Sequence, residues 1–458
     1  MMNTPSPSAS VAEQLADKVL SLAPGTIPAA VRARAEELLI DVVGLCVAAR
    51  RTDYIQALTA AVDGGGPCTA IGHAATFSGE HAALINGAAV HGEDFDDTFE
   101  GGPVHSSAVI VPAVLAACER FGCDGRAALI GIVAGVESLC RLSMVVPKAV
   151  HKSGFHPTSV LGTPAAALAV SAALAHNRKQ MVDALGHAGS FASGIIEYLA
   201  EGASTKRLHP GWAAQAGLQA ARIAAHGVLG PRTVFEGTHG LFNGFARSSE
   251  GDYDVLTGDF GERWHMEGIT FKPYATGTMN QPYIDCALRL AGKGFAAEDV
   301  KDVLCETAEG YVHRLWEPLA DKRHPPNGYA AKFSTPFNVA VAFVTGGAGF
   351  DAFSERSVRD KRVLALAGKV RYAVDPANPY PKAYTGHVRM TLKDGRVFEE
   401  RQPHIRGGVH EPLSRADIER KFRGNAAYGG WNARLADRFL VFTEEAFHGP
   451  IDLAPFRR

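Results

Sequence analysis

Apolar residues recur every three or four positions over the first sixty or so residues, with charged residues on the opposite side, which is the spacing of amphipathic helices. The pattern predicts helices over 11–23 and 31–51. A glycine-rich connection follows at 64–79, in which we expect a short extended piece. Helical segments rich in alanine and leucine then continue at 79–90, 106–121, 124–146, 158–175, 178–200 and 211–230. Their alanine, glycine and serine content favours close helix contact and a compact helical core.

The pattern changes near Thr270. The segments 301–315 and 361–375 are rich in β-formers mixed with charge, and 387–402 reads as two alternating runs joined through Asp394-Gly395, which is a hairpin signal. Two helices are expected between them, at 282–294 and 334–347. After about Gln402 the chain returns to helix, at 413–427 and 433–447. This is the composition of an α+β region of about 130 residues.

These segments predict a mainly α protein with an inserted α+β domain. A large helical domain would be built from both chain ends, residues 1–267 and 402–458, and the smaller domain from 268–401. A cleft between two domains is the default place for a ligand site. We find no internal repeat of 20–50 residues that would indicate a solenoid.

Composition narrows the class of protein. The chain has 458 residues, 46% hydrophobic and 21% charged, with a formal net charge of -2, so its charge gives no indication of nucleic acid or a membrane surface as a partner. Seven scattered cysteines without a CxxC pair indicate reduced thiols. The N-terminal run has neither the basic nor the apolar region of a signal peptide and is expected to be a short disordered tail. No apolar run free of charge reaches about 18 residues, and we expect a cytoplasmic protein.

The most informative run is HGEDFDDTFEGGPVH, residues 91–105, which lies between two apolar helices. Four of its carboxylates, Glu93, Asp94, Asp96 and Asp97, stand within five positions of the sequence. Buried charge is costly unless it is paired or used. If the upstream helix continues, Asp94 and Thr98 share one face at i and i+4, and His105 enters just before the next helix, where Ser106 or Ser107 is a suitable N-cap. The alternative is a solvated acidic turn with a surface histidine.

Basic residues recur just before predicted helix starts. They are His105, His156, Lys206, Arg207, His209 and Lys272. Pro157, Pro210 and Pro282 mark three of these starts, since proline favours the first helical position. A cation at a helix N-terminus is mildly unfavourable by itself, so the recurrence indicates a small anionic ligand bound among these residues. Singly, each such residue is more often a solvated or hydrogen-bonded structural side chain than a ligand-binding one.

Other chemistries have weaker signals. DFDD resembles half of an aspartate-rich Mg²⁺ site, but the chain has no second aspartate-rich segment, no HExxH and no zinc-ligand spacing, so no metal is expected. The GGGPCTAIG run lacks the P-loop pattern, and no GxGxxG follows a strand, so no nucleotide cofactor is expected. GHAGS at 186–190 loosely resembles a nucleophile motif but lies in a helical run.

With these residues identified, the sequence resembles the MmgE/PrpD family over nearly its whole length. The resemblance rests on motifs in the expected order: ALINGAAVHGEDFDDT with VHSSAV, GFHPTSVLGTPAAA, ASTKRLHPGWAAQAG, FKPYATGTMNQPYIDCAL, AKFSTPFNVAVA and PLSRADIERKFRGNA. It implies a helical domain with an inserted lid domain, a homodimer, and a cofactor-free enzyme for small polycarboxylates, such as 2-methylcitrate dehydratase, cis-aconitate decarboxylase or iminodisuccinate epimerase.

Carried over residue by residue, the resemblance implies a site made of Asp94, Thr98, His105, His156, Lys206 and Lys272. We expect the two histidines to be acid and base, Asp94 to orient one of them, Thr98 to donate a hydrogen bond, and the lysines to bind substrate carboxylates and stabilise enolate-like charge.

The chain departs from the family pattern at Phe337, where an ungapped alignment puts a tyrosine in the decarboxylase. It also departs in the GGPVHSS turn, and TGTMNQ differs from the best-known dehydratases. A dehydratase is our first reading. An epimerase, a decarboxylase and a non-catalytic carboxylate-binding protein are the alternatives.

Overall fold

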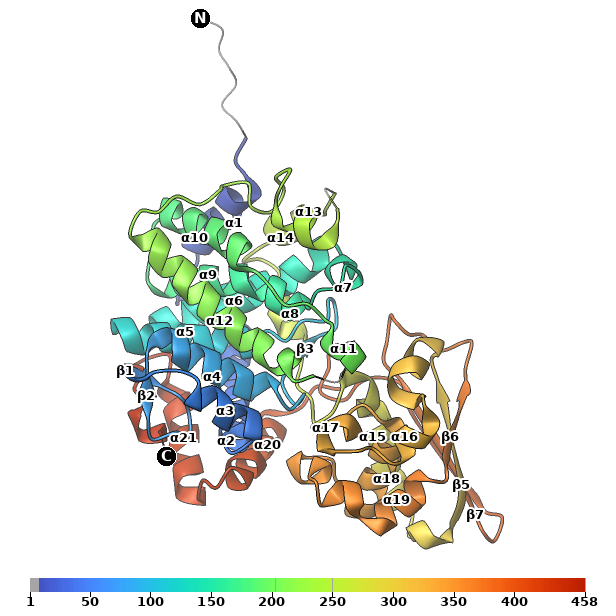
Figure 1. Cartoon of the computed structure of the whole chain (residues 1–458). Coiled ribbons are helices and arrows are strands. Elements are labelled where there is room, and N and C mark those ends of the chain that lie inside the picture. Colours follow the sequence, from blue (N-terminus) through green and yellow to red (C-terminus); the bar gives the residue numbers. More distant parts are fainter. Residues whose placement is uncertain (1–7, 202, 249, 458) are drawn as a thin grey trace, which may run out of the picture. The chain divides into compact units, whose positions relative to one another are not determined.

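The computed structural model describes residues 8–201, 203–248 and 250–457, which form two compact units (Figure 1). The first unit contains the chain up to Gly92, Asp96–Ile269 and Ile418–Arg458. The second contains Glu93–Phe95 and Thr270–Asp417. Residues 1–7 of the expected N-terminal tail lie outside the described residues. The first unit is thus built from both ends of the chain, and the turn Glu93–Phe95 belongs to the second.

The first unit is almost entirely helical, as the pattern predicts. Its longer helices are α1 (Val11–Leu20), α2 (Ala29–Ala49), α3 (Asp53–Ala60), α4 (Gly79–His91), α5 (Ser107–Phe121), α6 (Gly125–Val145), α9 (Gly162–Ala173), α10 (Arg178–Phe191), α12 (Thr205–Ala225), most of α20 (Arg415–Tyr428) and α21 (Ala433–Glu445). Its short helices are α7 (Ala149–Lys152), α8 (Pro157–Val160), α11 (Tyr198–Glu201), α13 (Leu241–Ala246) and α14 (Asp254–Thr257). In the glycine-rich connection, β1 (Gly64–Thr69) pairs antiparallel with β2 (Thr76–Phe77).

Helices α4 and α12 approach each other closely because glycines stand at their contact. A Cβ on Gly87 would lie 2.6 Å from Gly211 Cα, and a Cβ on Gly211 would lie 2.2 Å from Leu84 O. This confirms the expected close helix contact. His91 ends α4 just after this contact, and His209 lies on α12 just before it, so the crossing fixes where both histidines sit.

One helix among the described residues, α6, is long and apolar enough to cross a membrane by length and composition. However, 89% of its apolar window is buried inside the protein, as in a core helix. Its two buried charged residues are paired, since Arg141 Nε donates to Glu137 Oε1 at 2.6 Å.

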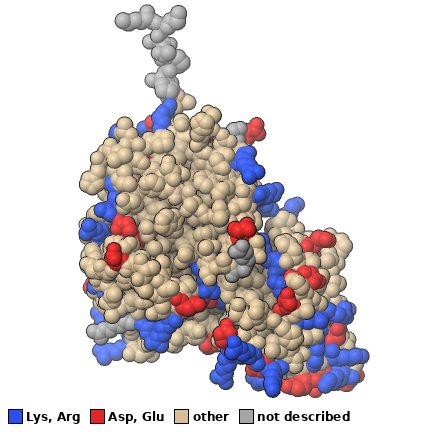
Figure 2. Space-filling view, viewed as in Figure 1, with Lys and Arg blue, Asp and Glu red and all other residues tan. Residues whose placement is uncertain are grey.

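The second unit combines helices with a four-stranded mixed sheet of order β6-β5-β7-β8. The strands are β5 (Val300–Thr307), β6 (Val370–Val374), β7 (Gly386–Leu392) and β8 (Val397–Gln402), and the helices are α15 (Gln281–Ala291), α16 (Leu319–Arg323), α17 (Gly328–Ala331), α18 (Thr335–Thr345) and α19 (Lys361–Ala367). The β7–β8 hairpin is antiparallel, as predicted, while β5 and β6 are parallel. Helix α15 packs on β7 and β8, and α18 packs on α15. Charged side chains are dense over this unit in Figure 2.

Two local predictions were wrong, one in each unit. The segment 361–375 is not all strand, because its leucine and alanine favour helix and Asp360 caps α19 by accepting from Arg362 N at 2.8 Å. Helix α12 begins at Thr205 rather than Pro210. Pro210 lies inside its second turn, where it removes one backbone hydrogen bond, and Lys206 lies in its first turn.

The helix before the acidic run also ends earlier than the i, i+4 reading of Asp94 and Thr98 requires. Helix α4 stops at His91, and Asp94 has φ +53°, a left-handed conformation that aspartate tolerates better than most residues. Thr98 lies in the short strand β3 (Thr98–Phe99). The two residues therefore do not share a helix face. The boundary between the two units lies within strand β4 (Ile269–Thr270), since Ile269 belongs to the first unit and Thr270 to the second.

Candidate active site

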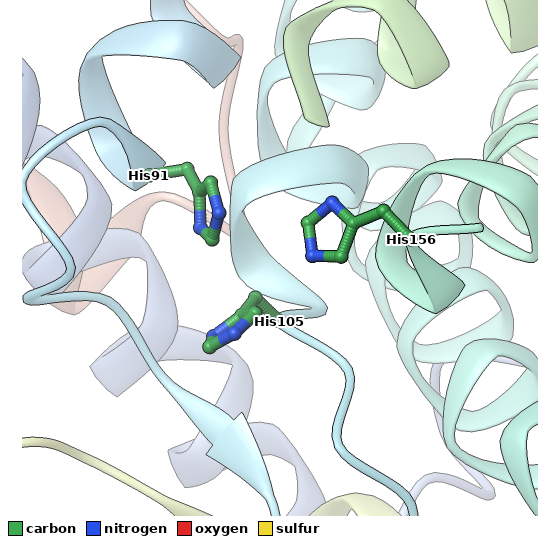
Figure 3. A group of neighbouring side chains, drawn as sticks. All are labelled: His91, His105 and His156. Carbon is green, nitrogen blue, oxygen red and sulfur yellow. The ribbon is translucent and has the colours of Figure 1, made fainter. Parts of the chain in front are cut away.

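Three histidines from separate helix ends form a cluster in the first unit (Figure 3). His91 is the last residue of α4, His105 precedes α5, and His156 is the N-cap residue of α8. The ring centroids lie 4.7 Å apart for His91 and His105, 5.6 Å for His91 and His156, and 6.4 Å for His105 and His156. We call these three residues the histidine cluster.

Asp96 anchors the first two rings of the cluster. His91 Nδ1 donates to Asp96 Oδ2 at 2.6 Å, and both side chains are fully buried. His105 Nδ1 lies 3.6 Å from Asp96 Oδ1 and donates to the Asp97 carbonyl at 2.6 Å. A carbonyl or carboxylate oxygen can only accept here, so Nδ1 carries the proton in each ring and Nε2 is the basic nitrogen when the ring is neutral.

His156 is held by a fourth histidine. Its Nδ1 lies 3.1 Å from His209 Nδ1, and the Tyr198 ring packs edge-on against both, with centroids 6.3 Å and 5.7 Å away. Burial lowers the pKa of His156 well below its ordinary value, and the neighbouring charges of His91 and Lys206 lower it further. Burial and the same two charges lower the pKa of His209 to about 4. Both rings are therefore neutral at pH 7. Lys206 lies close enough for its charge to lower the pKa of both rings.

Asp97 has a structural task that its neighbour Asp96 does not share. Its carboxylate accepts from the backbone N–H and the hydroxyl of Ser106, at 3.1 and 2.8 Å, and from the same two groups of Ser107. The capping group of α5 is thus Asp97, whereas the Ser106 side chain makes no capping hydrogen bond. Burial and the charge of Asp96 raise the pKa of Asp97 to about 6. This N-terminus is consequently occupied by a protein carboxylate.

The second unit contains an arrangement of a different kind, in which two buried lysines bind the turn Glu93–Phe95. Lys272 Nζ donates to the Asp94 carbonyl at 3.1 Å. Lys332 Nζ donates to the carbonyls of Glu93 at 3.0 Å and Ala275 at 2.8 Å, and it lies 3.2 Å from Glu93 Oε2. The two ammonium groups therefore hold main-chain oxygens in place.

Comparison with known proteins identifies the family. Residues 13–254 match the MmgE/PrpD N-terminal domain, and residues 274–438 match the MmgE/PrpD C-terminal domain. The chain belongs to the MmgE/PrpD family. It is an MmgE/PrpD-type enzyme, and the two matched domains cover most of both units.

Several curated proteins are similar to this MmgE/PrpD chain along most of its length. A cis-aconitate decarboxylase-like protein of Aspergillus oryzae is 25% identical over 91% of the chain and 90% of its own length. The cis-aconitate decarboxylase of Mus musculus is 28% identical over 76% of the chain and 72% of its own length. The cis-aconitate decarboxylase of Aspergillus terreus is 27% identical over 88% of the chain and 86% of its own length.

The six residues that the MmgE/PrpD resemblance implies are divided between the units. His105, His156, Lys206 and Thr98 lie in the first, and Asp94 and Lys272 in the second. The structure brings His105 and His156 together, with the Lys206 charge beside them.

Sequence reasoning missed four members of the histidine cluster and its surroundings: His91, Asp96, His209 and Tyr198. His91 was taken as the first residue of the acidic run and was given no role, and His209 was noted only as a basic residue before Pro210. One signal was available, since His91 and Asp96 are close in sequence and both lie within the run that we singled out. Lys332 was also missed, because it lies in a helical, apolar context.

Proposed function

We propose that this protein is a cofactor-independent lyase for a small di- or tricarboxylic acid, whose chemical step moves a proton at the carbon next to a carboxylate. The observation that carries the proposal is the pairing of His105 and His156 from different helix ends beside the charge of Lys206. Two imidazoles with one nitrogen held and the other basic are suited to act as acid and base.

The reaction proposed first is dehydration. One imidazole of the pair takes the proton from the carbon next to the carboxylate, and the electron pair of that C–H bond forms the C=C bond. The other imidazole, in its protonated form, delivers a proton to the leaving hydroxyl, which departs as water. One proton is gained by the site and one is lost, so no other reactant is consumed.

Lys206 is proposed to bind a substrate carboxylate and to stabilise the enolate-like charge that builds up as the proton leaves. It lies in the first turn of α12, where the helix N-terminus adds to the positive field. Because Asp97 already occupies the N-terminus of α5, that helix end is left out of substrate binding. Thr98, buried in β3, is proposed to donate a hydrogen bond to the substrate.

The second candidate is decarboxylation of a cis-aconitate-like acid, because the similar curated proteins are named cis-aconitate decarboxylases. Phe337 counts against it. This residue is fully buried on α18, and the decarboxylase has a tyrosine there by ungapped alignment, so this chain lacks that hydroxyl. Epimerisation of a dicarboxylate would use the same two imidazoles on opposite faces of one carbon.

Proton NMR of a panel of citrate-like and aspartate-derived acids in D₂O separates the three reactions. Dehydration gives a new vinyl signal without loss of CO₂, and decarboxylation gives a product with one carboxylate fewer. Epimerisation exchanges the hydrogen next to the carboxylate without forming a C=C bond. If no acid of the panel is converted or exchanged, the proposal is wrong.

Asp94 and Lys272 remain predictions from the family resemblance, as does the homodimer. For the two residues we propose a test by Lys272→Met, with Lys301→Met as the matched control because Lys301 is exposed. A role in the reaction requires kcat/KM to fall in the first variant and not in the second. Size-exclusion chromatography with light scattering tests the dimer.

A further inference from the structure

The histidine cluster has the features of a metal-binding site as well as those of an acid–base site. We propose that His91, His105 and His156 bind one divalent transition-metal ion of the zinc class through their Nε2 atoms, and that the bound ion inhibits the enzyme. This goes beyond the proposed function, in which the same imidazoles transfer protons. No metal site is predicted from the sequence, because the three residues are far apart and fit no recognised ligand spacing.

The ring nitrogens are close enough for a common ion. One nitrogen of each ring lies within 4.8 Å of the others, and the close-up shows the three rings gathered in one place from three segments of the chain (Figure 3). Zinc–nitrogen bonds of about 2.0–2.1 Å at tetrahedral angles put ligand nitrogens about 3.3 Å apart. Small side-chain rotations therefore complete the geometry without movement of the helices.

The nitrogen not offered to the ion is already held in all three rings. His91 Nδ1 is bound by Asp96, His105 Nδ1 by the Asp97 carbonyl, and His156 Nδ1 lies 3.1 Å from His209 Nδ1. Metal-bound histidines in proteins usually have such an outer partner, which fixes the tautomer and orients the ring. The pairing of His91 with a buried carboxylate is the most favourable of the three, because it also raises the basicity of Nε2.

An independent observation comes from His91 itself. The residue is 1% exposed, and its Nε2 atom is buried with no hydrogen-bond partner among the described residues. Buried polar atoms are rarely left unsatisfied. This atom belongs to the ring that lies closest to His105, so an ion at the cluster would satisfy it.

The chemistry of the ligands selects the ion. Three imidazoles suit Zn²⁺, Co²⁺ or Ni²⁺, whereas Mg²⁺ and Ca²⁺ prefer oxygen ligands. The Asp96 carboxylate offsets part of the ion's charge, and the Lys206 ammonium opposes it, so we expect moderate affinity. Since the lone pairs of His105 and His156 would be taken up in metal bonds, the ion would block proton transfer.

Binding is tested on the full-length, chelator-treated protein by titration with Co²⁺, whose visible ligand-field bands report coordination by a few nitrogen ligands. We expect one equivalent per chain in the wild type. His105→Gln and His91→Gln should abolish that band, while His404→Gln should leave it unchanged. His404 is the matched control because it belongs to a histidine pair outside the cluster. Its ring stacks on that of His410, with centroids 4.4 Å apart.

Asp96→Asn provides a variant that keeps the size of the outer partner and removes its charge. We expect the Co²⁺ band to keep its shape and the affinity to fall about 10- to 100-fold, as for other outer partners of metal-bound histidines. Circular dichroism shows whether each variant is folded. The proposal is overturned if folded His105→Gln retains the wild-type band, if only His404→Gln loses it, or if the wild type binds no Co²⁺ at submillimolar concentration.

The inhibition is tested with Zn²⁺ on whichever acid is converted in the NMR panel. We expect loss of activity that excess chelator restores, and equal inhibition of the wild type and His404→Gln. Metal binding is measured without substrate, so its failure is distinguishable from failure of the proposed function. Stoichiometric binding at the cluster without loss of activity would contradict the inhibitory role.

Discussion

The histidine cluster of the first unit and the lysine pair of the second use polar side chains in different ways. In the cluster, one nitrogen of each ring is held by the protein, and the three rings lie next to one another. In the second unit, Lys272 and Lys332 donate to main-chain carbonyls of the turn Glu93–Phe95. We propose proton transfer for the first arrangement, whereas the lysines of the second position the backbone of the turn.

The difference follows from the side chains themselves. An imidazole has two nitrogens in fixed directions, so the protein can anchor one and leave the other basic. An ammonium group has donors only, and in a buried place it must satisfy them with oxygens. Lys332, 1% exposed, has three oxygens within 3.2 Å.

The largest expected effect is on catalysis by the histidine cluster. His105→Gln should lower kcat/KM by about 10²- to 10⁴-fold, because a positioned acid or base contributes that much, while the melting temperature should change little. The matched control is His226→Gln on the exposed C-terminal end of α12. Turnover within a few-fold of the wild type in a folded His105→Gln would remove this residue from the mechanism.

Next in size is the loss of a buried cation in the second unit. Lys332→Met should lower the free energy of unfolding by about 3–5 kcal/mol, because it leaves the Glu93 carboxylate and two carbonyls without their donor. Lys301→Met, at an exposed position, should change it by less than about 0.5 kcal/mol. Chemical denaturation measures both. A stable Lys332→Met protein that has lost activity would reverse the comparison and place this lysine in the chemistry.

The helix crossing that positions two of the histidines gives a smaller effect. Gly211→Ala should destabilise the protein by about 1–3 kcal/mol, because the new Cβ would overlap the Leu84 carbonyl. Gly424→Ala is the matched helical control, since a Cβ there meets nothing within 4 Å, and it should stabilise by up to about 1 kcal/mol. Equal unfolding curves for the two variants would show that the crossing tolerates a side chain.

The smallest effect on activity is expected from replacing His209, whose ring lies against His156. His209→Gln should lower kcat by about threefold to tenfold, the worth of one hydrogen bond of about 0.5–1.5 kcal/mol, and should leave KM nearly unchanged. Steady-state kinetics on the converted acid measures both constants. A change in KM alone would mean that His209 contacts substrate instead of positioning His156.

Much of the fold followed from local patterns. Helical periodicity located the longer helices of the first unit, although the segment predicted as one helix at 178–200 is helical only to Phe191 and again from Tyr198. Asp394-Gly395 located the β7–β8 hairpin. Proline preference alone did not locate the start of α12, because the preference for the first helical position is not a requirement. The helix at 361–367 was missed because its residues suit both helix and strand.

The candidate site was only partly predictable for a related reason. His105 and His156 stood out because each precedes a helix start, which is a local signal. Asp96 and Asp97 are neighbours with the same side chain, yet one anchors His91 and the other caps α5. That division depends on which groups the tertiary fold brings within reach, and no spacing in the sequence encodes it. His91 opens the acidic run, and nothing in its local spacing marks it as the partner of Asp96.

The central claim, that His105 and His156 move a proton next to a carboxylate of a small polycarboxylic acid, is tested most directly by isotope incorporation. Wild type and His105→Gln are incubated in D₂O with the citrate-like acids, including cis-aconitate, and followed by proton NMR. We expect deuterium at the carbon next to a carboxylate, together with net loss or addition of water, in the wild type only. Incorporation at the same rate in both proteins, or in neither, would contradict it.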